Sequence, residues 1–224
     1  MTLFATPPSN KGTRFGQAPA VPAVKIVFDK LLGASLMILT APLWLLISLA
    51  ILIESGVSPA NRGGLFHSEV RISAGRPFML HKFRILKAGG EAAIKAGAVP
   101  KVVENDPANL TKVGWTLKKV GFDELPQLIN ILNGSMSFVG PRPKPAAEYE
   151  VEIEHGRVFR ARLRAGLTGP VQVMKGTSRT DDDQIRADFA YADLLEHGPR
   201  WRVLSFDIKI LFRTILVMLK ATGE

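Results

Sequence analysis

The strongest pattern of apolar and polar positions lies near the N-terminus, where residues 31–53 carry no ionisable side chain. A helix needs about 20 consecutive apolar residues to cross the hydrocarbon core of a bilayer. The run therefore predicts a membrane helix, which we place within residues 25–54. It is too long for the apolar region of a secretory signal peptide, and no Ala-x-Ala-like cleavage site follows it. We expect the segment to stay on the mature protein.

Pro42 lies near the middle of this run. Proline removes a backbone donor and clashes with the carbonyl four residues back, so we expect the helix to break at Ala41 and Pro42. Basic residues, which prefer the cytoplasmic side, flank both ends of the run: Lys25, Lys30, Arg62, Arg71, Arg76, Lys82 and Arg84. A re-entrant helix that returns to the same face places the basic residues of both flanks on the cytoplasmic side. We favour it over a kinked straight span, which would place only one of the two basic flanks on that side.

The chain on either side of this helix has weaker patterns. Residues 1–24 lack an apolar period and are rich in Pro, Gly, Ser and Thr, which predicts a flexible basic arm. Residues 65–72 and 77–85 are rich in β-branched and aromatic side chains and flank Ala74-Gly75, which predicts a β-hairpin. We treat residues 55–224 as one domain.

Helical patterns dominate the rest of the chain, at residues 123–133, 144–155, 181–196 and 200–220. In the first of these, Asp123 is placed to cap the helix, Pro126 is tolerated in the first turn, and Gly134 ends it. The last is amphipathic, and we expect it to pack on the core rather than on lipid. The predicted fold is α/β and mainly helical: a single membrane-associated domain with a Pro-broken re-entrant membrane helix, a small β-hairpin and amphipathic helices.

Charge narrows the class of partner. The 224 residues include 29 Lys and Arg against 20 Asp and Glu, a formal net charge of +9. This balance favours nucleic acid, phospholipid headgroups or a phosphorylated substrate. No Arg-rich recognition helix or aromatic stacking platform is evident, so we expect no nucleic acid. The absence of cysteine excludes disulfides, thiolate metal sites and cysteine nucleophiles, and the four histidines lack zinc-ligand spacing.

Candidate chemistry is concentrated between residues 121 and 143. Asp123 and Glu124 are adjacent carboxylates at a predicted helix start, and local physics alone favours a simple cap for Asp123. Cations surround this pair in the sequence, at Lys112, Lys118, Lys119 and Arg142. A carboxylate among cations stays ionised and can act on an anionic phosphate that would otherwise repel it. This clustering favours a catalytic role over a cap.

Over most of residues 25–217 the chain resembles the bacterial sugar transferases, also called monotopic phosphoglycosyl transferases. The resemblance is carried by the segments KIVFDKLLGASLMILTAPLWLL, GRPFMLHKFRIL, FDELPQLINILNGSMSFVGPRP and RAGLTGPVQV. It implies that Asp123 attacks the β-phosphate of a UDP-sugar, expels UMP and holds a covalent glycosyl phosphate. Undecaprenyl phosphate then takes the sugar phosphate. Glu124 is implied to bind magnesium, a hard cation that prefers oxygen ligands.

The resemblance also implies a set of substrate-binding residues: Lys82, Arg84, Lys118, Pro141, Arg142, Pro143 and Arg164. The implied partners are a UDP-sugar, undecaprenyl phosphate and membrane lipid, and a homo-oligomer is compatible with the family. The implied location is the bacterial inner (cytoplasmic) membrane, with residues 55–224 as a cytoplasmic catalytic domain. The alternative is a catalytically inactive, membrane-anchored scaffold of a glycan-assembly complex.

The chain departs from the family pattern at several positions. Ala41 replaces the usual serine before Pro42, and Lys118 replaces an arginine, so a point charge replaces a bidentate fork. Val70 stands where an arginine is usual, and Ser135 replaces an acid. The Gly-Arg-Asn that usually follows the glutamine of Gly-x-x-Gln-x is absent after Gln172. This last difference bears on the choice of sugar.

Overall fold

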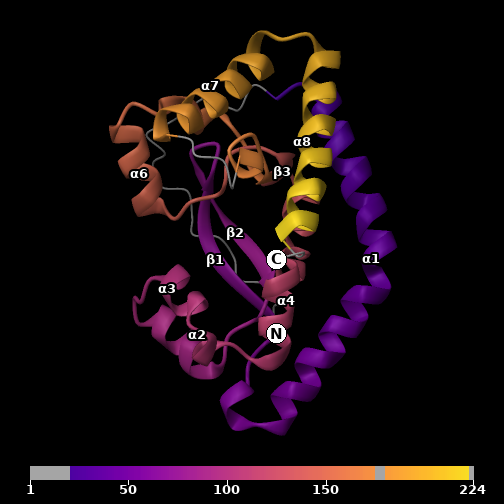
Figure 1. The fold of residues 1–224 in the computed structure, drawn as a ribbon, viewed down its shortest axis with the longest axis vertical. Coiled ribbons are helices and arrows are strands. Elements are labelled where there is room, and N and C mark those ends of the chain that lie inside the picture. The colour runs from indigo at the N-terminus through magenta and orange to yellow at the C-terminus, as the bar shows by residue number, and fades with distance from the viewer. Residues whose placement is uncertain (1–20, 175–179, 222–224) are drawn as a thin grey trace. The chain divides into compact units, whose positions relative to one another are not determined.

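The computed structural model describes residues 21–174 and 180–221, and it is mainly helical, as the sequence predicts (Figure 1). Most of the predicted N-terminal arm lies outside the described residues. By its contacts, the described chain divides into two compact units. The first unit comprises residues 35–69 and 81–128; the second comprises residues 21–34, 70–80, 129–174 and 180–221.

The predicted membrane helix is α1, Ala23–Val57, which is long and apolar enough to cross a membrane. Several of its large apolar side chains are exposed: Ile38, Leu39, Leu45, Leu46, Leu49, Leu52 and Ile53. Exposed leucine and isoleucine in such number fit a helix whose surroundings are lipid. The backbone stays helical through Pro42, so Ala41 and Pro42 lie inside one element. The re-entrant topology stays a prediction.

The predicted hairpin is confirmed as β1, Phe66–Ser73, and β2, Arg76–Phe83, which form a two-stranded sheet. Ala74 and Gly75 connect them with φ angles of 49° and 71°. Two consecutive left-handed residues define the type I′ turn, whose twist matches that of the flanking strands. The glycine adopts this conformation at little cost, whereas Ala74 is held in it by the turn.

The first unit has its own apolar core, in which the second half of α1 takes part. Three short helices that the sequence pattern did not predict belong to this unit: α2, Ala88–Lys95, α3, Pro100–Asn105, and α4, Lys112–Val120. The core is formed by Ile47, Ile51, Phe83, Ile85, Leu86, Val103, Leu110 and Leu117. A hydrogen-bonded contact links α1 to α4, since the Glu54 carboxylate accepts from the backbone N–H groups of Lys112 and Val113 at 2.7 and 3.1 Å.

The helix predicted at residues 123–133 is wrong in its first part. A 3-10 turn covers Phe122–Glu124, and the helix α5 begins only at Gln127 and ends at Leu132. The Leu125 N–H donates to the Phe122 carbonyl oxygen at 3.3 Å, which is the i to i+3 hydrogen bond of a 3-10 turn and not that of an α-helix. Gly134 follows the helix with a φ of 84°, as a C-terminal glycine should.

The second unit surrounds a short parallel pair of strands, β3, Met136–Val139, and β4, Ala165–Thr168. The predicted helices of this unit are confirmed as α6, Ala146–Glu154, α7, Asp181–His197, and α8, Arg200–Ala221. Helix α7 begins with a capping box, in which Thr180 and Asp183 exchange side-chain and backbone hydrogen bonds. The run of three aspartates is therefore the first turn of a helix.

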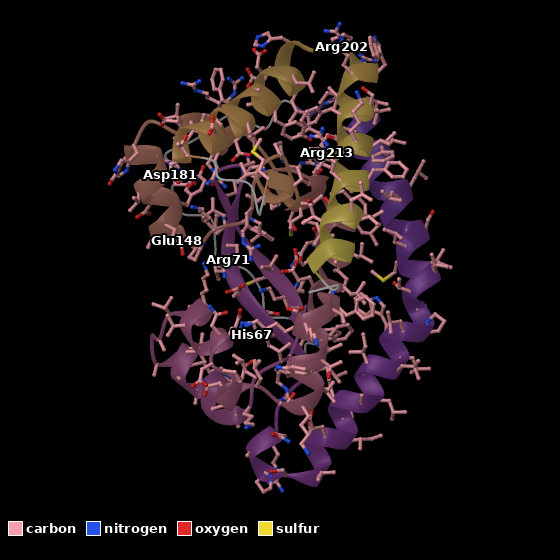
Figure 2. The ribbon with its side chains drawn as sticks, in the orientation of Figure 1. His67, Arg71, Glu148, Asp181, Arg202 and Arg213 are labelled. Carbon is pink, nitrogen blue, oxygen red and sulfur yellow. The ribbon has the colours of Figure 1, made fainter. Side chains whose placement is uncertain are left out.

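Helix α8 is amphipathic, and only one of its faces packs on the core of the second unit. Val203, Asp207 and Ile210 are buried, whereas Trp201 and Phe212 are exposed. Arg202 and Arg213 project from the helix in Figure 2. The buried Asp207 carboxylate accepts a hydrogen bond from the buried Lys25 ammonium, which ties the start of α1 to α8. The expectation of core packing is confirmed for the buried face.

Candidate functional site

Asp123 is the buried member of the adjacent carboxylate pair. Gly121 ends α4 in the left-handed conformation, with a φ of 76°, and the chain turns directly into the 3-10 turn that carries both acids. This turn leaves Asp123 only 6% exposed and Glu124 partly exposed. The N-cap of the turn is Gly121. Asp123 is therefore not the helix cap that its local sequence favours.

Burial makes the Asp123 carboxyl a weaker acid than the carboxyl of an exposed aspartate. Burial, which is the largest effect, and the neighbouring charge of Glu124 together raise the pKa of this carboxyl to about 6. The Lys82 ammonium opposes both effects. A carboxylate whose pKa is raised towards neutrality stays largely ionised at pH 7 and is more basic than an exposed one, which suits a nucleophile.

The lysines that precede Asp123 in sequence have other partners in the structure. Lys118 donates from Nζ to the carbonyl oxygen of Glu104, and to Asn105 Oδ1 at 3.2 Å. Lys119 lies over the Trp115 ring, with Nζ 5.3 Å from its centroid. The cation that lowers the pKa of Asp123 is instead Lys82, from strand β2. Lys82 therefore acts on Asp123 in the structure, whereas Lys118 and Lys119 are engaged by other groups.

Lys82 and Arg84 follow each other closely in the chain but differ in their partners. Lys82 is 8% exposed, and its Nζ lies 3.8 Å from a carboxylate oxygen of Glu69. The Arg84 guanidinium donates to the carbonyl oxygens of Gly64 and Leu86 at 2.7 and 2.8 Å, and to Ser55 Oγ at 2.6 Å. Each of its three nitrogens is thus engaged within the first unit. This geometry favours a structural role for Arg84 over a phosphate contact.

The carboxylate pair has the chemistry of a magnesium site. Among the described residues no group of three or more His, Asp or Glu side chains is arranged to hold a metal. Magnesium does not need such a group, because it keeps several waters and is bound by one or two carboxylates together with substrate phosphates. Asp123 and Glu124 repel one another electrostatically, which raises the pKa of Asp123. A nearby dication would relieve that repulsion, so the donor set fits magnesium.

The remaining sequence-predicted residues belong to the second unit, where Pro141, Arg142 and Pro143 follow β3. Their backbone is held on both sides, because the Pro141 carbonyl accepts from the Gly166 N–H at 2.9 Å and the Arg142 carbonyl from Arg160 Nη2 at 2.9 Å. The backbone of Arg164 lies so close to Gly140 that no side chain fits at this position. A Cβ on Gly140 would lie 2.2 Å from the Arg164 carbonyl oxygen. The Arg142 side chain itself is exposed.

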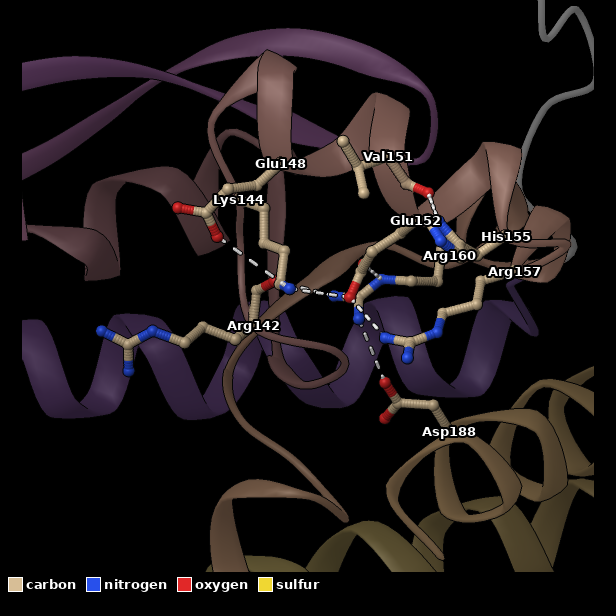
Figure 3. Close-up of polar contacts among 9 residues, drawn as sticks. All are labelled: Arg142, Lys144, Glu148, Val151, Glu152, His155, Arg157, Arg160 and Asp188. Atoms are coloured by element: carbon tan, nitrogen blue, oxygen red, sulfur yellow. Dashed lines mark hydrogen bonds and ion pairs between the residues drawn. The ribbon is translucent and has the colours of Figure 1, made fainter. Parts of the chain in front are cut away.

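Arg142 lines a cavity of about 480 Å³ within the second unit. The other charged side chains of the cavity wall were not among the residues that the sequence predicted to bind substrate. At their centre is Glu152, whose Oε1 accepts from Lys144 Nζ at 2.7 Å and Arg157 Nη1 at 2.8 Å (Figure 3). Arg160 joins Glu152 to Asp188, with nitrogen–oxygen distances of 3.0 and 3.4 Å. The spacing of Glu152, Arg160 and Asp188 in the sequence follows no helical or strand period, so the sequence did not indicate that these side chains meet.

Arg164 and Arg142 line different cavities of the second unit. Arg164 borders a smaller cavity of about 270 Å³, next to the hairpin turn and with Arg76 and Ser135 in its wall. The Arg142 cavity does not include Arg164. The backbone of Arg164 thus lies beside Gly140, next to residues 141–143, whereas its side chain borders a different cavity from that of Arg142.

The chain belongs to the bacterial sugar transferase family, whose model matches residues 21–221. The expected resemblance is thereby confirmed. Named relatives add detail. The chain is 33% identical over 190 residues to the UDP-glucose:undecaprenyl-phosphate glucose-1-phosphate transferase of Escherichia coli, covering 84% of this chain and 38% of that protein.

Two further relatives are covered over more of their length. A protein of the same name from Caulobacter vibrioides is 35% identical over 88% of this chain and 70% of its own length. The exopolysaccharide production protein ExoY of Rhizobium meliloti is 32% identical over 88% of this chain and 86% of its own length. The chain thus spans just over a third of the Escherichia coli relative and most of the other two.

Proposed function

We propose that this protein transfers a sugar 1-phosphate from a UDP-sugar to undecaprenyl phosphate, with release of UMP, as a membrane step of exopolysaccharide or glycoconjugate synthesis. Family membership supports this, because relatives are named as transferases of a sugar phosphate to undecaprenyl phosphate. The observation that carries the assignment to particular residues is the buried carboxyl of Asp123, beside Glu124 and under the influence of Lys82.

In the first half of the proposed reaction, a carboxylate oxygen of Asp123 forms a bond to the β-phosphorus of the donor. The bond between that phosphorus and the bridging oxygen breaks, and UMP leaves with the electron pair. The result is a glycosyl phosphate held on Asp123. Low solvent access at Asp123 protects such an acyl phosphate from water, which would otherwise hydrolyse it.

In the second half, a phosphate oxygen of undecaprenyl phosphate attacks the same phosphorus. The bond to Asp123 breaks, the carboxylate is regenerated, and the product is a polyprenyl diphosphate sugar. Two successive displacements let two anionic substrates use one site in turn, so their mutual repulsion never has to be overcome at once.

Of the remaining residues, we assign magnesium binding to Glu124 and phosphate contacts to Lys82 and Arg142. Bound magnesium would neutralise the donor diphosphate and stabilise the leaving UMP. Lys82 is the cation already acting on Asp123, and Arg142 presents an exposed guanidinium on a fixed backbone. Arg84 and Lys118 support the fold around Asp123 through their hydrogen bonds.

In the proposed reaction, helix α1 would hold Asp123 at the depth of the lipid acceptor. The phosphate of undecaprenyl phosphate lies at the level of the headgroups while its tail stays in hydrocarbon, so the nucleophile must be held at that depth. We propose that α1 is re-entrant at Ala41 and Pro42 and keeps the catalytic part on the cytoplasmic face of the inner membrane. Basic side chains at both ends of the helix support this topology.

The test is UMP release by the detergent-purified protein from a panel of UDP-sugars, with undecaprenyl phosphate and magnesium. Asp123→Asn keeps the shape of the side chain and removes the nucleophilic oxygen, so we expect UMP release to fall by at least about a thousandfold. Without acceptor, wild-type protein should release about one UMP per molecule and gain the mass of one sugar phosphate. The variant should show neither.

Asp182→Asn is the matched control, because Asp182 is an exposed acid in the first turn of α7 and belongs to no proposed site. It should retain wild-type activity. If wild-type protein releases no UMP from any donor, the transferase proposal fails and the inactive scaffold becomes the better description. If Asp123→Asn retains activity, the reaction does not pass through Asp123.

A further inference from the structure

The second unit has a smaller cavity beside the hairpin turn, with a volume of about 270 Å³. Its wall comes from three segments of the chain: the hairpin turn with the start of β2, the residues between α5 and β3, and the residue before β4. All three segments belong to the second unit. The cavity is thus a feature of one compact part of the fold.

Hydrogen bonds around Ser73 fasten these three segments to one another. Ser73 Oγ donates to the Ser135 carbonyl oxygen at 2.6 Å and accepts from the Ala165 N–H at 3.0 Å. The Ala74 N–H donates to the Leu163 carbonyl oxygen at 2.9 Å. Water has little access to these bonds at Ser73, because this residue is only 8% exposed. The cavity wall is therefore formed before any ligand binds, which lowers the entropic cost of binding.

The charged side chains of this wall are cations. Among the described residues that line the cavity, Arg76 and Arg164 are charged and none is acidic. Neither guanidinium has a hydrogen bond or an ion pair with another described residue. Arg164 is partly buried, and its Nη1 lies 3.9 Å from the position that a Cβ on Gly134 would occupy. Two cations in one wall, with no acid in the same wall, make the cavity favourable for an anion.

Position 135 contributes to this charge pattern. Ser135 lines the cavity and stands where the family pattern has an acid. Its hydroxyl donates to the Asn130 carbonyl oxygen and to Asn133 Oδ1, and it carries no charge. The chain therefore supplies no carboxylate to the two arginines from this position.

Charge and size favour a phosphate group over other anions. A phosphate monoester carries about −1.5 to −2 charges near pH 7, which matches two guanidiniums, whereas a carboxylate would neutralise only one. Guanidinium donors also form the planar fork that pairs with phosphate oxygens. The cavity is smaller than the range of about 300–1,000 Å³ that is typical of pockets for whole ligands, so it has room for a phosphate group and not for a nucleotide.

We propose that this cavity is an anion site that binds a phosphate group through Arg76 and Arg164. The site is independent of the proposed transfer reaction, and it gives Arg164 a ligand other than the sugar nucleotide. Two sources supply such a group to a protein with a membrane helix: the phosphomonoester headgroup of phosphatidic acid, and phosphate in solution. The two arginines offer the same donors to either source.

The test is thermal unfolding of the detergent-purified protein near pH 7, with inorganic phosphate added up to about 20 mM at constant ionic strength. Binding to the folded state should raise the unfolding temperature saturably, by about 3–6 °C for a dissociation constant of about 1 mM. Arg76→Gln and Arg164→Gln should each remove most of this rise, because each loses a charge-assisted contact and weakens binding about tenfold or more. Arg76 is exposed, so its variant keeps the test decisive if Arg164→Gln does not fold.

Two other arginines provide the matched controls. Arg213 is exposed on α8 and belongs to no proposed site, so Arg213→Gln should keep the full rise. Arg142→Gln should keep it too, because Arg142 lines the other cavity. A rise that Arg142→Gln removes and Arg76→Gln retains would overturn the assignment, since phosphate would then be bound where we place the donor phosphates.

Position 135 allows the converse test. Ser135→Asp adds a carboxylate to the cavity wall, whereas Ser135→Asn adds a side chain of similar size without charge. Both variants lose the serine hydroxyl, so the difference between them reports the added charge. The aspartate variant should lose most of the rise with phosphate, and the asparagine variant should keep it. Equal rises in the two would contradict an electrostatic site.

Lipid distinguishes the two sources of phosphate. The same measurement in mixed micelles compares phosphatidic acid with phosphatidylcholine, which has no phosphomonoester. If the lipid headgroup is the ligand, phosphatidic acid alone of the two lipids should stabilise the wild-type protein, and it should not stabilise Arg76→Gln. If the ligand is phosphate in solution, only inorganic phosphate should give the rise. No saturable rise with either probe, or a rise that all four arginine variants share, overturns the proposal.

Discussion

At the scale of single residues, burial decides the roles of acids that look alike in sequence. Asp123 belongs to an acidic pair of the kind that often caps helices, yet its carboxyl is buried in a 3-10 turn and its pKa is raised to about 6. Asp188 is a second buried acid with a pKa of about 6, inside a charged network that the sequence did not indicate. Asp182, in contrast, is an exposed acid in the first turn of α7.

Asp188 predicts a pH dependence of stability. Burial raises its pKa, Arg160 opposes this, and Glu152 adds to it, so the folded pKa is about 6 against an ordinary value of 3.8. Between these two values the folded state binds more protons than the unfolded state. The contribution of Asp188 to stability is therefore fully present below about pH 4 and lost as pH rises through 6, by up to about 3 kcal/mol.

The measurement is thermal unfolding in detergent from pH 4 to 8, for wild type and Asp188→Asn. Because other groups titrate over the same range, the quantity of interest is the difference between the two proteins. The variant should gain stability relative to wild type as pH rises. A difference that stays constant across the range would mean that Asp188 does not titrate as its surroundings indicate.

At the scale of elements, the end of α1 and the start of α4 are joined by one side chain. The Glu54 carboxylate accepts from the first two backbone N–H groups of α4, which have no partner within the helix itself. Thr111 is the N-cap of the same helix, and its Oγ1 accepts a hydrogen bond from the Gly114 N–H at 2.9 Å. Helix α4 leads into the turn that carries Asp123, so the Glu54 contact links α1 to the proposed nucleophile within the first unit.

Glu54→Ala removes an acceptor from two helix N–H groups, so we expect it to destabilise the protein by about 1–2 kcal/mol. Differential scanning fluorimetry in detergent should show a lowered unfolding temperature. Glu150→Ala, at an exposed position on α6, is the matched control and should leave the unfolding temperature nearly unchanged. Equal shifts for the two variants would show that the contact with α4 contributes nothing measurable.

At the scale of the whole molecule, the proposed re-entrant topology of α1 predicts that both of its ends lie on one face of the membrane. The natural absence of cysteine makes single-cysteine labelling straightforward. Ala23 and Gly56 are exposed positions near the two ends of α1, and a Cβ at Gly56 would meet no atom within 4 Å. Cysteine at either position should therefore be tolerated.

We expect a membrane-impermeant maleimide to label both Ala23→Cys and Gly56→Cys from the cytoplasmic face of inside-out vesicles, and neither from the outside of intact spheroplasts. This pattern follows if both ends of a re-entrant helix lie on one face. Labelling of the two positions from opposite faces would instead establish a straight span. A cysteine at the exposed position of Glu150 on α6 reports the face on which the second unit's helix α6 lies, which we expect to be the cytoplasmic one.

The sequence alone determined those features that depend on neighbouring residues. Residues 31–53 form a run of 23 residues without an ionisable side chain, and this run predicts a membrane helix whatever fold the rest of the chain adopts. Ala74-Gly75 between two strand patterns predicts a tight hairpin, and the apolar period of residues 200–220 predicts α8. The pairing of Asp123 with Glu124 and the motif around it indicated the family.

Only the tertiary structure decided features that depend on residues far apart in the chain. The choice of Lys82 over Lys118 as the cation near Asp123 follows from where β2 lies. The cavity beside Arg142 depends on α6 and α7, and Asp188 lies 46 residues from Arg142 in the printed sequence. The short helices α2 and α3 have too few turns for an apolar period to stand out. Burial and long-range contacts are properties of the fold, and no local pattern specifies them.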